Sequence, residues 1–595
     1  MPLSLMKESK SAVTIRRKRQ RTFTGHSEFG IRHKSSSVDE NSDLTEEDPD
    51  PLLDTPPQLW LPVLRLIMSS EKTLFLGLLA FRVVNALMIQ TSYVPDEFWQ
   101  STEVAHKMAF GYGYLTWEWK TGIRSYLYPS MFALLFKILA FLKLDTRILL
   151  IKLPRLLQAV FAALSDLYLF KFSCKLQNQT VGNWALLCQL TSWFTFYCAT
   201  RTLTNSMETT LSVIALYYFP WPGKPRKAHW KYVTLIGLAV MIRPTAAILW
   251  IPLCLWHLIL YQNVVWKVVK LFAERGFIVL SMSSMVDRIF YGRWVNVHYN
   301  FLETNVFANI GSFYGTHPWH WYLTQGFPIL LGAHIFPFIA AVRQNLEKTC
   351  SAIIFWTVFA YSMLSHKEFR FLMPVLPLCM HVCGCYIHQM VDIDVVRNED
   401  SANKQLSDIT RKSKPKRFNR RTAVIIFLIA SNLPLALYTG LIHQRGTVDV
   451  MRYLHSEVSQ HGPEKVDILF LMPCHSTPYY SYLHYNASMR FLTCEPNIEK
   501  SQNYSEEAEV FYNDPGGWLK GQFWNKDISY PTHIAHFNGL EPELVDFFSA
   551  NNYTECATFF HTHFPEGRVG SHVVVKCLDS FKSRSHKVYS NRFQR

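Results

Sequence analysis

Residues 95–100 read Pro95-Asp96-Glu97-Phe98-Trp99-Gln100, and they closely follow the first long apolar stretch of the chain, residues 73–90. A second polar run, His366-Lys367-Glu368-Phe369-Arg370-Phe371, lies between two later apolar stretches. Ionisable residues at the boundary of a membrane are unfavourable, and they usually mark a site of chemistry or transport. If both runs lie on the same side of a membrane, they can form one active site.

Apolar stretches occupy most of the chain between residues 73 and 443. They are about 16 to 22 residues long, close to the ~20 residues that span a bilayer as a helix. Charged residues make up only 18% of the 595 residues, below the ~25% of ordinary globular proteins. We therefore predict a polytopic α-helical membrane protein with about 11 to 13 spans in residues 73–443. The division of residues 143–222 into spans stays open.

Positive charge gathers in two segments outside the apolar stretches, and the whole chain carries a net charge of +15. One segment is Arg16-Arg17-Lys18-Arg19, and the other is Lys412-Ser413-Lys414-Pro415-Lys416-Arg417. Basic segments beside membrane spans stay in the cytosol, which explains both runs without a nucleic-acid partner. The first run also resembles a nuclear-import signal. We expect residues 1–72 to form a basic, Ser-rich, mostly disordered cytosolic tail, and residues 393–421 to form a cytosolic loop.

These two cytosolic segments fix the side of the other loops. One span after residue 72 places residues 91–126 on the far side, and one span after residue 421 places residues 444–595 there too. Counting back from residue 393 places residues 366–371 on the same far side, so both polar runs share a face. Three N-glycosylation sequons agree with this orientation of the C-terminal region: Asn486, Asn503 and Asn552.

Residues 444–595 differ from the apolar part and are expected to form a small mixed α/β domain. Residues 466–470 and 572–576 alternate in the manner of strands. In an oxidising lumen, four cysteines here would form two disulfides, with three pairings possible: Cys474, Cys494, Cys556 and Cys577. The remaining cysteines are interpreted as small buried hydrophobic residues, and no metal site is predicted.

The loop of residues 91–126 carries the first set of candidate catalytic groups. Asp96, Gln100 and Glu103 are spaced i, i+4 and i+7, so a helix would place them on one stripe. Pro95 at the first helical turn sets Asp96 near a helix N-terminus, where the ionised carboxylate is favoured and a general base is well placed. The alternative is an amphipathic surface helix whose acids are merely solvated.

The second polar run offers three potential cations, His366, Lys367 and Arg370, together with Glu368. Such a set suits a phosphate or diphosphate. The alternative is a positive loop that flanks a span, but such loops favour the cytosolic side. Residues 314–321 add an aromatic run that suits either sugar rings or an interfacial belt.

Together these motifs resemble those of the dolichol-phosphate-mannose-dependent mannosyltransferases. The stretches that carry the resemblance are residues 93–101, 113–119, 124–126, 314–322 and 366–371. Residues 471–480 resemble the branch of the family that acts on GPI-anchor precursors. The likeness extends over about residues 73–580, and its specificity comes from the co-occurrence of several motifs.

The resemblance implies a GT-C glycosyltransferase fold in the endoplasmic reticulum membrane, with its active site and a small mixed α/β C-terminal domain in the lumen. It implies transfer of the third mannose, in α-1,2 linkage, from dolichyl-phosphate mannose to a GPI precursor carrying two mannoses. Because the donor is a β-mannosyl phosphate and the product is α, the reaction is a single inverting displacement. Such a step needs a general base and stabilisation of the departing phosphate. No metal or other cofactor is expected; membrane lipids are partners, and protein partners stay open.

Roles follow for individual residues. Asp96 is the expected base, with Glu97 as its rival. The groups expected to bind the donor phosphate are His366, Lys367, Arg370 and Arg124. Those expected to bind the sugars are Gln100, Glu103, Glu118, His317, Trp319 and Glu368.

Three other functions fit parts of the sequence. An N-glycan mannosyltransferase of the same family would share the motifs and the chemistry. A transporter or lipid flippase would carry ionisable residues near the bilayer midplane together with internal repeats, whereas here the charges gather in loops. A scaffold or receptor would fit the basic tail but would leave the two polar runs unexplained.

Overall fold

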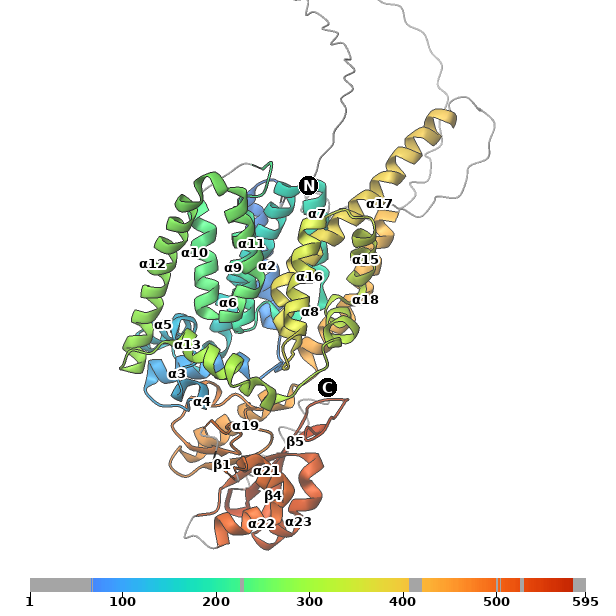
Figure 1. Ribbon diagram of the computed structural model, residues 1–595. Coiled ribbons are helices and arrows are strands. Elements are labelled where there is room, and N and C mark those ends of the chain that lie inside the picture. Colours follow the sequence, from blue (N-terminus) through green and yellow to red (C-terminus); the bar gives the residue numbers. More distant parts are fainter. Residues whose placement is uncertain are drawn as a thin grey trace, which may run out of the picture. The chain divides into compact units, whose positions relative to one another are not determined.

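The computed structural model describes residues 66, 68–224, 229–405, 420–498, 501–502, 504–524 and 529–581 (Figure 1). The predicted tail up to residue 65, the basic run of residues 412–417 and the sequon at Asn503 lie outside these residues.

The long apolar stretches form helices. In chain order these are α2 (Glu71–Met88), α5 (Leu127–Phe141), α6 (Arg147–Leu176), α7 (Gln179–Thr191), α8 (Trp193–Cys198), α9 (Thr204–Tyr218), α10 (His229–Ile242), α11 (Ala247–Leu260), α12 (Val265–Tyr291), α15 (Ile335–Arg343), α16 (Lys348–Ser362), α17 (Leu376–Gln405) and α18 (Arg420–Leu441).

Among the described residues, four helical stretches are long and apolar enough to cross a membrane: Arg147–Leu176, Tyr322–Arg343, Phe369–Val391 and Arg420–His461. A fifth would be the pair Pro244–Leu260 and Gln262–Tyr291, which is bent by 81°. Shorter apolar helices such as α5 and α10 do not reach that length. The chain is a multi-pass membrane protein, and the number of about 11 to 13 spans stays a prediction.

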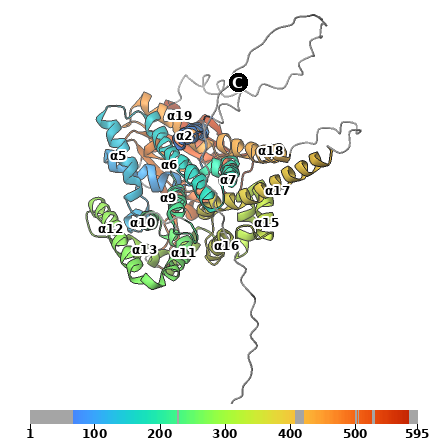
Figure 2. The same cartoon turned by 90° about the horizontal axis from the view of Figure 1, so that it is seen from above.

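Buried polar contacts join the helices, in addition to apolar packing. The Arg82 guanidinium on α2 pairs with the Asp166 carboxylate on α6 at 2.6 Å, and both side chains are fully buried. Gln189 on α7 donates to the same carboxylate at 3.3 Å. Figure 2 shows α2, α6, α7 and α9 side by side, in agreement with their packing. Because a buried charge needs a partner, this network fixes α2 and α6 at one relative position.

Short elements fill the two loops that carry the sequence motifs. Between α2 and α5 lie the π-helical turn η1 (Phe98–Thr102), α3 (Glu103–Phe110) and α4 (Trp117–Lys120). Between α12 and α15 lie α13 (Val297–Leu302), η4 (Glu303–Phe307), η5 (Ile310–Tyr314), η6 (Tyr322–Gly326), α14 (Phe327–Leu331) and η7 (Gly332–His334). The turns η2 (Pro244–Ala246) and η3 (Gln262–Val264) border α11, and η8 (Phe369–Val375) leads into α17.

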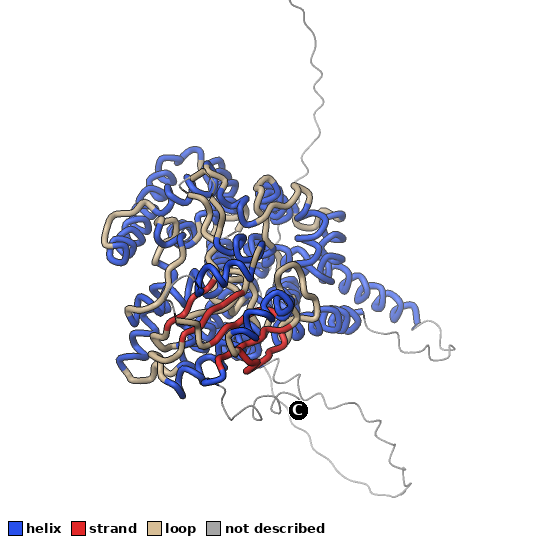
Figure 3. Tube along the Cα trace, turned by 90° about the horizontal axis from the view of Figure 1, so that it is seen from below, coloured by secondary structure: helices blue, strands red, loops and turns tan. Residues whose placement is uncertain are grey.

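The C-terminal region forms a five-stranded mixed sheet with helices, which confirms the predicted α/β domain (Figure 3). Its elements are α19 (Gly446–His461), β1 (Asp467–Leu471), α20 (Tyr480–Leu483), β2 (Ser488–Phe491), α21 (Glu507–Asn513), α22 (Pro515–Leu519), η9 (Lys520–Trp524), β3 (His533–Phe537), η10 (Asn538–Leu540), α23 (Glu541–Ala550), β4 (Tyr553–Phe560), β5 (His572–Leu578) and η11 (Asp579–Phe581).

The strand order of the sheet is β2-β1-β3-β5-β4. β1 runs parallel to β2 and β3, with Leu469 opposite Ile534, whereas β5 runs antiparallel to β3 and β4. Alternate residues of β1 face opposite sides. Ile468 and Phe470 join the core beside α19, and Leu469 and Leu471 join the core beside α23. This two-sided burial explains why residues 468–471 are all apolar, so the alternation expected for residues 466–470 does not hold within the strand.

The four cysteines of this domain pair as Cys474–Cys494 and Cys556–Cys577, each with Cα atoms 6.0 Å apart. The sequence left three pairings open because Cys556 and Cys577 become neighbours only when β4 pairs with β5. Asn486 and Asn552, two of the three sequon residues, have exposed side chains on this domain.

Candidate active site

Asp96 and Glu97 are adjacent in the chain but lie in different surroundings. The Glu97 side chain is fully buried and binds two guanidinium groups, Arg155 at 2.7 Å and Arg201 at 2.6 Å. A doubly paired buried carboxylate holds structure together and is closed to an acceptor hydroxyl. Of the two candidate bases, the geometry therefore favours Asp96.

The Asp96 side chain is 24% exposed, and its Oδ2 accepts a hydrogen bond from Arg370 Nη1 at 2.5 Å. Within the described part of the chain, no hydrogen bond reaches its Oδ1. One oxygen is thus held in place while the other stays open, which is the arrangement that a general base needs.

Arg370 connects Asp96 to a second carboxylate. Its Nε and Nη2 donate to the two oxygens of Glu368, both at 2.6 Å. Burial opposes ionisation of Glu368, but the Arg370 guanidinium and the His366 ring outweigh it and hold the pKa of this carboxyl well below its usual range. Asn205 on α9 fixes the arginine by donating to its backbone oxygen at 3.1 Å. Among the described residues, Asp96 and Glu368 together accept three of the five N–H bonds of the guanidinium, so two remain for a ligand.

A second ion pair lies on the same face. Arg124 binds Glu118 at 2.6 Å, and Gln100 donates to Glu118 at 3.3 Å. Burial would lower the pKa of Arg124, but Glu118 and Asp96 outweigh it and raise that pKa above its ordinary value. Trp117 donates to the Tyr314 hydroxyl at 2.7 Å and so joins this group to the aromatic run of residues 314–321, the aromatic loop.

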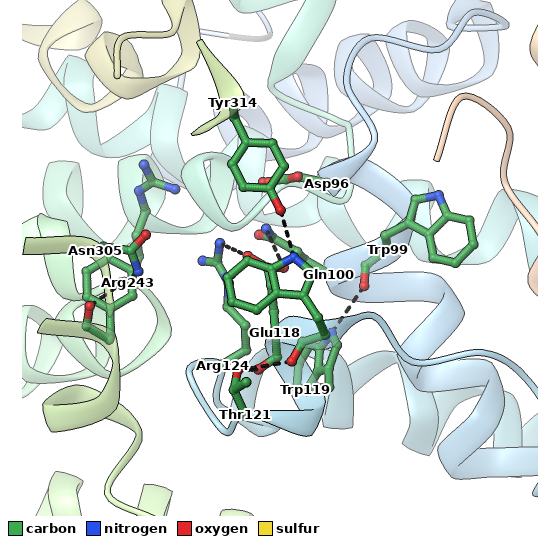
Figure 4. Close-up of polar contacts among 12 residues, drawn as sticks. Asp96, Trp99, Gln100, Glu118, Trp119, Thr121, Arg124, Arg243, Asn305 and Tyr314 are labelled. Atoms are coloured by element: carbon green, nitrogen blue, oxygen red, sulfur yellow. Dashed lines mark hydrogen bonds and ion pairs between the residues drawn. The ribbon is translucent and has the colours of Figure 1, made fainter. Parts of the chain in front are cut away.

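In Figure 4, Asp96, Gln100, Glu118, Arg124 and Tyr314 lie together. They come from distant parts of the sequence: the loop after α2, α4 with the segment that follows it, and η5. The carboxylates of Asp96 and Glu118 and the guanidinium of Arg124 therefore lie in one cluster.

His366 and Lys367, which the sequence suggested as phosphate-binding groups, make their hydrogen bonds to the aromatic loop and to neighbouring residues. Lys367 Nζ donates to the backbone oxygens of His317, at 2.8 Å, and Leu364. His366 contacts the Gly315 oxygen at 2.9 Å and Glu368 at 3.0 Å. Burial would lower the pKa of His366, but the hydrogen bond to Glu368 outweighs it and raises that pKa. Both residues therefore join the aromatic loop to the second polar run and do not face Asp96.

The aromatic loop presents its own candidate residues to solvent. The His317 ring stacks on Trp321 with centroids 4.5 Å apart, and Trp319 is 62% exposed. Neither side chain is part of the cluster around Asp96. A ring with this exposure can meet a sugar or the membrane interface.

The predicted stripe of Asp96, Gln100 and Glu103 is not formed, because η1 is a π-helical turn. A π turn inserts extra residues per turn and shifts the direction of the side chains that follow. Asp96 consequently faces Arg370 and Gln100 faces Glu118, whereas Glu103 points to the C-terminal domain. The sequence spacing alone could not reveal this shift.

Glu103 attaches that domain to the loop. Its carboxylate accepts from the Tyr479 backbone at 2.7 Å and from the Ser481 hydroxyl at 2.5 Å. Burial raises the pKa of Glu103 to about 7, against the effect of these hydrogen bonds. The loop of residues 91–126 and the C-terminal domain therefore lie on one face, as the topology prediction requires.

The segment that precedes Tyr479 closes one side of the site. The Trp99 indole donates to the Thr477 oxygen at 3.1 Å, and its ring packs on His475 with centroids 4.7 Å apart. Burial lowers the pKa of His475 to about 4, and nearby Asp96 opposes this shift. The His475 ring therefore lies against Trp99, on a loop fixed by the Cys474–Cys494 disulfide.

Sequence reasoning missed the residues that hold the site in place. Arg155 and Arg201 fix Glu97, and both arginines occur in or beside apolar helices. Ionisable residues in such positions are a general sign of function, and this signal would have found them.

Comparisons with known proteins agree with this architecture. Residues 73–484 match the Alg9-like mannosyltransferase family. The chain is 47% identical over 513 residues to "GPI alpha-1,2-mannosyltransferase 3" of Homo sapiens, covering 86% of this chain and 87% of that protein. It is 41% identical over 486 residues to "GPI mannosyltransferase 3" of Drosophila melanogaster, covering 80% and 81%.

The fold is similar to that of a solved GT-C glycosyltransferase, ArnT from Cupriavidus metallidurans bound to undecaprenyl phosphate. The TM-score is 0.52 with 11% identity, over 86% of this chain and 99% of ArnT. This likeness confirms the predicted GT-C fold. At 11% identity it shows the fold and no more. The match over most of the chain and the identity to curated relatives place the protein in the Alg9-like mannosyltransferase family.

Proposed function

We propose that the protein transfers the third mannose of a GPI anchor, in α-1,2 linkage, from dolichyl-phosphate mannose to a precursor that carries two mannoses. The observation that carries this proposal is the identity to relatives named GPI alpha-1,2-mannosyltransferase 3 over most of both chains. The resemblance of residues 471–480 to that branch supports the same acceptor, because Thr477 of this segment accepts a hydrogen bond from Trp99 in the loop of residues 91–126.

In the proposed reaction, Asp96 accepts the proton of the attacking hydroxyl of the second mannose. The hydroxyl oxygen forms a bond to C1 of the donor mannose as the bond from C1 to the phosphate oxygen breaks. The electron pair of that bond leaves with dolichyl phosphate, and the configuration at C1 inverts. Positioned proton transfer of this kind contributes roughly 10²- to 10⁴-fold to a rate.

Arg124 and Arg370 are placed to stabilise the negative charge of the departing phosphate. Both lie near Asp96, and each keeps N–H bonds beyond those used by its carboxylate partner. A guanidinium fork matches phosphate oxygens in pairs. Such handling of the phosphate does not require a metal ion, and we propose none for this step.

Glu118 and Gln100 line the same cluster and are proposed to bind sugar hydroxyls, and the exposed His317 and Trp319 are proposed to contact sugars outside it. In this proposal Glu97, Glu103, His366 and Lys367 position the loops and do not touch substrate. Glu368 acts through Arg370 in the same manner.

We also propose that the catalytic face and the C-terminal domain lie in the lumen of the endoplasmic reticulum. Two disulfides and the exposed side chains of Asn486 and Asn552 support an oxidising compartment with access to N-glycosylation. Removal of N-glycans by endoglycosidase H should shift the mobility of the chain, and an Asn486→Gln, Asn552→Gln double variant should lose part of that shift.

The test of the function is mass spectrometry of lipid-linked glycans in cells that lack the protein. We expect GPI precursors with two mannoses to accumulate, and the intact chain, but not Asp96→Asn, to relieve the accumulation. Truncated dolichol-linked oligosaccharides with normal GPI species would instead assign the protein to N-glycan synthesis. No change in either pool would contradict both transferase assignments.

A further inference from the structure

A group of metal-ligating side chains lies at the end of α16 opposite the candidate active site. Glu347 is the N-cap residue of α16 and Cys350 lies on its first turn, while His381 belongs to α17. The ligand atoms of these three residues all lie within 4.8 Å of one another. Since α16 runs for 15 residues, about 20 Å of helix separates the group from residues 365–371.

A fourth ligand adjoins this group. Cys385 Sγ lies 3.9 Å from His381 Nε2, and Glu347 Oε2 lies 3.9 Å from the same nitrogen. Ligand atoms around a tetrahedral zinc ion lie about 3.4 to 3.8 Å apart, given Zn–S near 2.3 Å and Zn–N near 2.0 Å. The two separations from His381 Nε2 exceed these values by a few tenths of an ångström. Cys385 lies outside the set of ligand atoms that are all within 4.8 Å of one another, so its side chain must move toward Glu347 or Cys350 when an ion binds.

The spacing of the four residues follows from helix geometry. Glu347 and Cys350 are i and i+3 at the start of α16, and His381 and Cys385 are i and i+4 on α17. Residues at these spacings share one helix face. Because α16 packs on α17, the two faces bring one carboxylate, one imidazole and two sulfurs together.

Hydrogen bonds from residues outside the group orient two of its four side chains. His381 Nδ1 lies 2.9 Å from the Ser173 hydroxyl, which leaves Nε2 directed at Cys385 and Glu347. Gln177 donates to Glu347 at 2.8 Å. A metal-bound histidine nearly always makes such a bond through its second nitrogen. Cys350 and His381 are fully buried and Cys385 nearly so, whereas the Glu347 side chain is 12% exposed and connects the group to solvent.

One other group of this kind occurs among the described residues, formed by Cys474, His475 and Cys494. Its two sulfurs are joined in a disulfide, so it offers no thiolate to a metal. Cys350 and Cys385 are both free cysteines.

We propose that Cys350, Cys385, His381 and Glu347 bind one Zn²⁺ ion that joins α16 to α17. The two thiols release their protons to solvent as their sulfurs bind the ion, His381 binds through Nε2, and Glu347 binds through a carboxylate oxygen. Four protein ligands without an open position are typical of a structural zinc site. The ion fixes the two helices whose other ends lead into the second polar run.

The test is zinc content of the full-length protein, purified in detergent through a peptide epitope tag and without chelators or a histidine tag. By inductively coupled plasma mass spectrometry, we expect about one zinc per chain in the wild type. The Cys350→Ser, Cys385→Ser double variant should lose most of it, whereas Cys254→Ser, which removes a thiol outside the group, should keep it. Wild-type zinc content in the double variant would contradict the proposal, because the metal would then be bound elsewhere.

A second measurement uses the wild type alone and does not depend on the folding of a variant. After the zinc is removed by chelation, Co²⁺ should restore thermal stability and give the intense thiolate-to-cobalt absorption of a site with two cysteines. A wild-type protein without zinc as purified, and with neither a Co²⁺ spectrum nor a change in unfolding temperature, would overturn the proposal.

Discussion

The loop between α2 and α5 holds Asp96 and Glu103 in surroundings of opposite character. Asp96 is partly open to solvent and lies beside the guanidinium groups of Arg370 and Arg124. Glu103 is buried and is held by neutral donors of Tyr479 and Ser481. In the proposed mechanism the same type of side chain therefore serves two purposes. Near cations and solvent it can exchange a proton with a substrate, whereas among neutral donors it connects two parts of the protein.

The largest expected effect is that of Asp96→Asn on mannose transfer. We expect the rate to fall by roughly 10²- to 10⁴-fold, because an amide cannot accept the proton of the acceptor hydroxyl. The measurement is transfer from dolichyl-phosphate mannose by purified protein, with the thermal unfolding temperature as a check on folding. The exposed Asp546→Asn should retain normal activity, and a normal rate in Asp96→Asn would remove Asp96 from the mechanism.

Replacement of the neighbouring carboxylate should affect stability instead. In Glu97→Gln the buried guanidinium groups of Arg155 and Arg201 lose their counter-charge, which is expected to destabilise the fold by about 3 to 5 kcal/mol. The measurement is a decrease in unfolding temperature and in yield, compared with the exposed Glu543→Gln. If Glu97→Gln kept its stability but lost activity, Glu97 and not Asp96 would be the better base.

Glu103 should make stability depend on pH. Burial raises its pKa in the folded protein from 4.5 to about 7, so the unfolded chain loses the proton first as the pH rises. The folded state should therefore lose up to about 3 kcal/mol between pH 4.5 and 7, with no further change above that range.

The measurement for Glu103 is the difference in unfolding temperature between the wild type and Glu103→Gln at pH 5 and at pH 8. We expect the wild type to lose more stability than the variant over this interval, whereas Glu543→Gln should behave like the wild type. Equal losses in wild type and Glu103→Gln would show that Glu103 does not carry this pH dependence.

The smallest effect is expected for Arg370→Lys. A lysine keeps the charge but cannot contact Asp96 and both oxygens of Glu368 at once, so we expect a decrease in rate of roughly 10- to 100-fold, or about 1.4 to 2.7 kcal/mol in the barrier. The measurement is the turnover rate at saturating donor, with the exposed Arg452→Lys as control. An unchanged rate would argue against a role of the Arg370 fork at the phosphate.

Much of the architecture could be predicted from local pattern. The apolar stretches became helices, residues 466–470 and 572–576 mark β1 and β5, and the two polar runs meet where Arg370 binds Asp96. Apolar length, strand alternation and positive charge are properties of short segments, and each has a direct physical consequence that does not depend on the rest of the chain.

Assignments that required contacts between distant segments could not be made in that way. Which of Asp96 and Glu97 is accessible depends on Arg155 and Arg201, which follow later in the chain. The sequence also could not predict that Lys367 donates a hydrogen bond to the backbone oxygen of His317. Both outcomes are decided by packing, because long side chains take their direction from the partners that surround them.

By itself the sequence determined a membrane protein with polar groups at one face and a mixed α/β domain beyond the last apolar stretch. Only the tertiary structure decided the cysteine pairing, the accessible carboxylate and the attachment of Glu103 to Ser481. The physical reason is that burial in a membrane depends on the composition of short stretches, whereas ion pairs and disulfides depend on distances of a few ångströms between residues far apart in the chain.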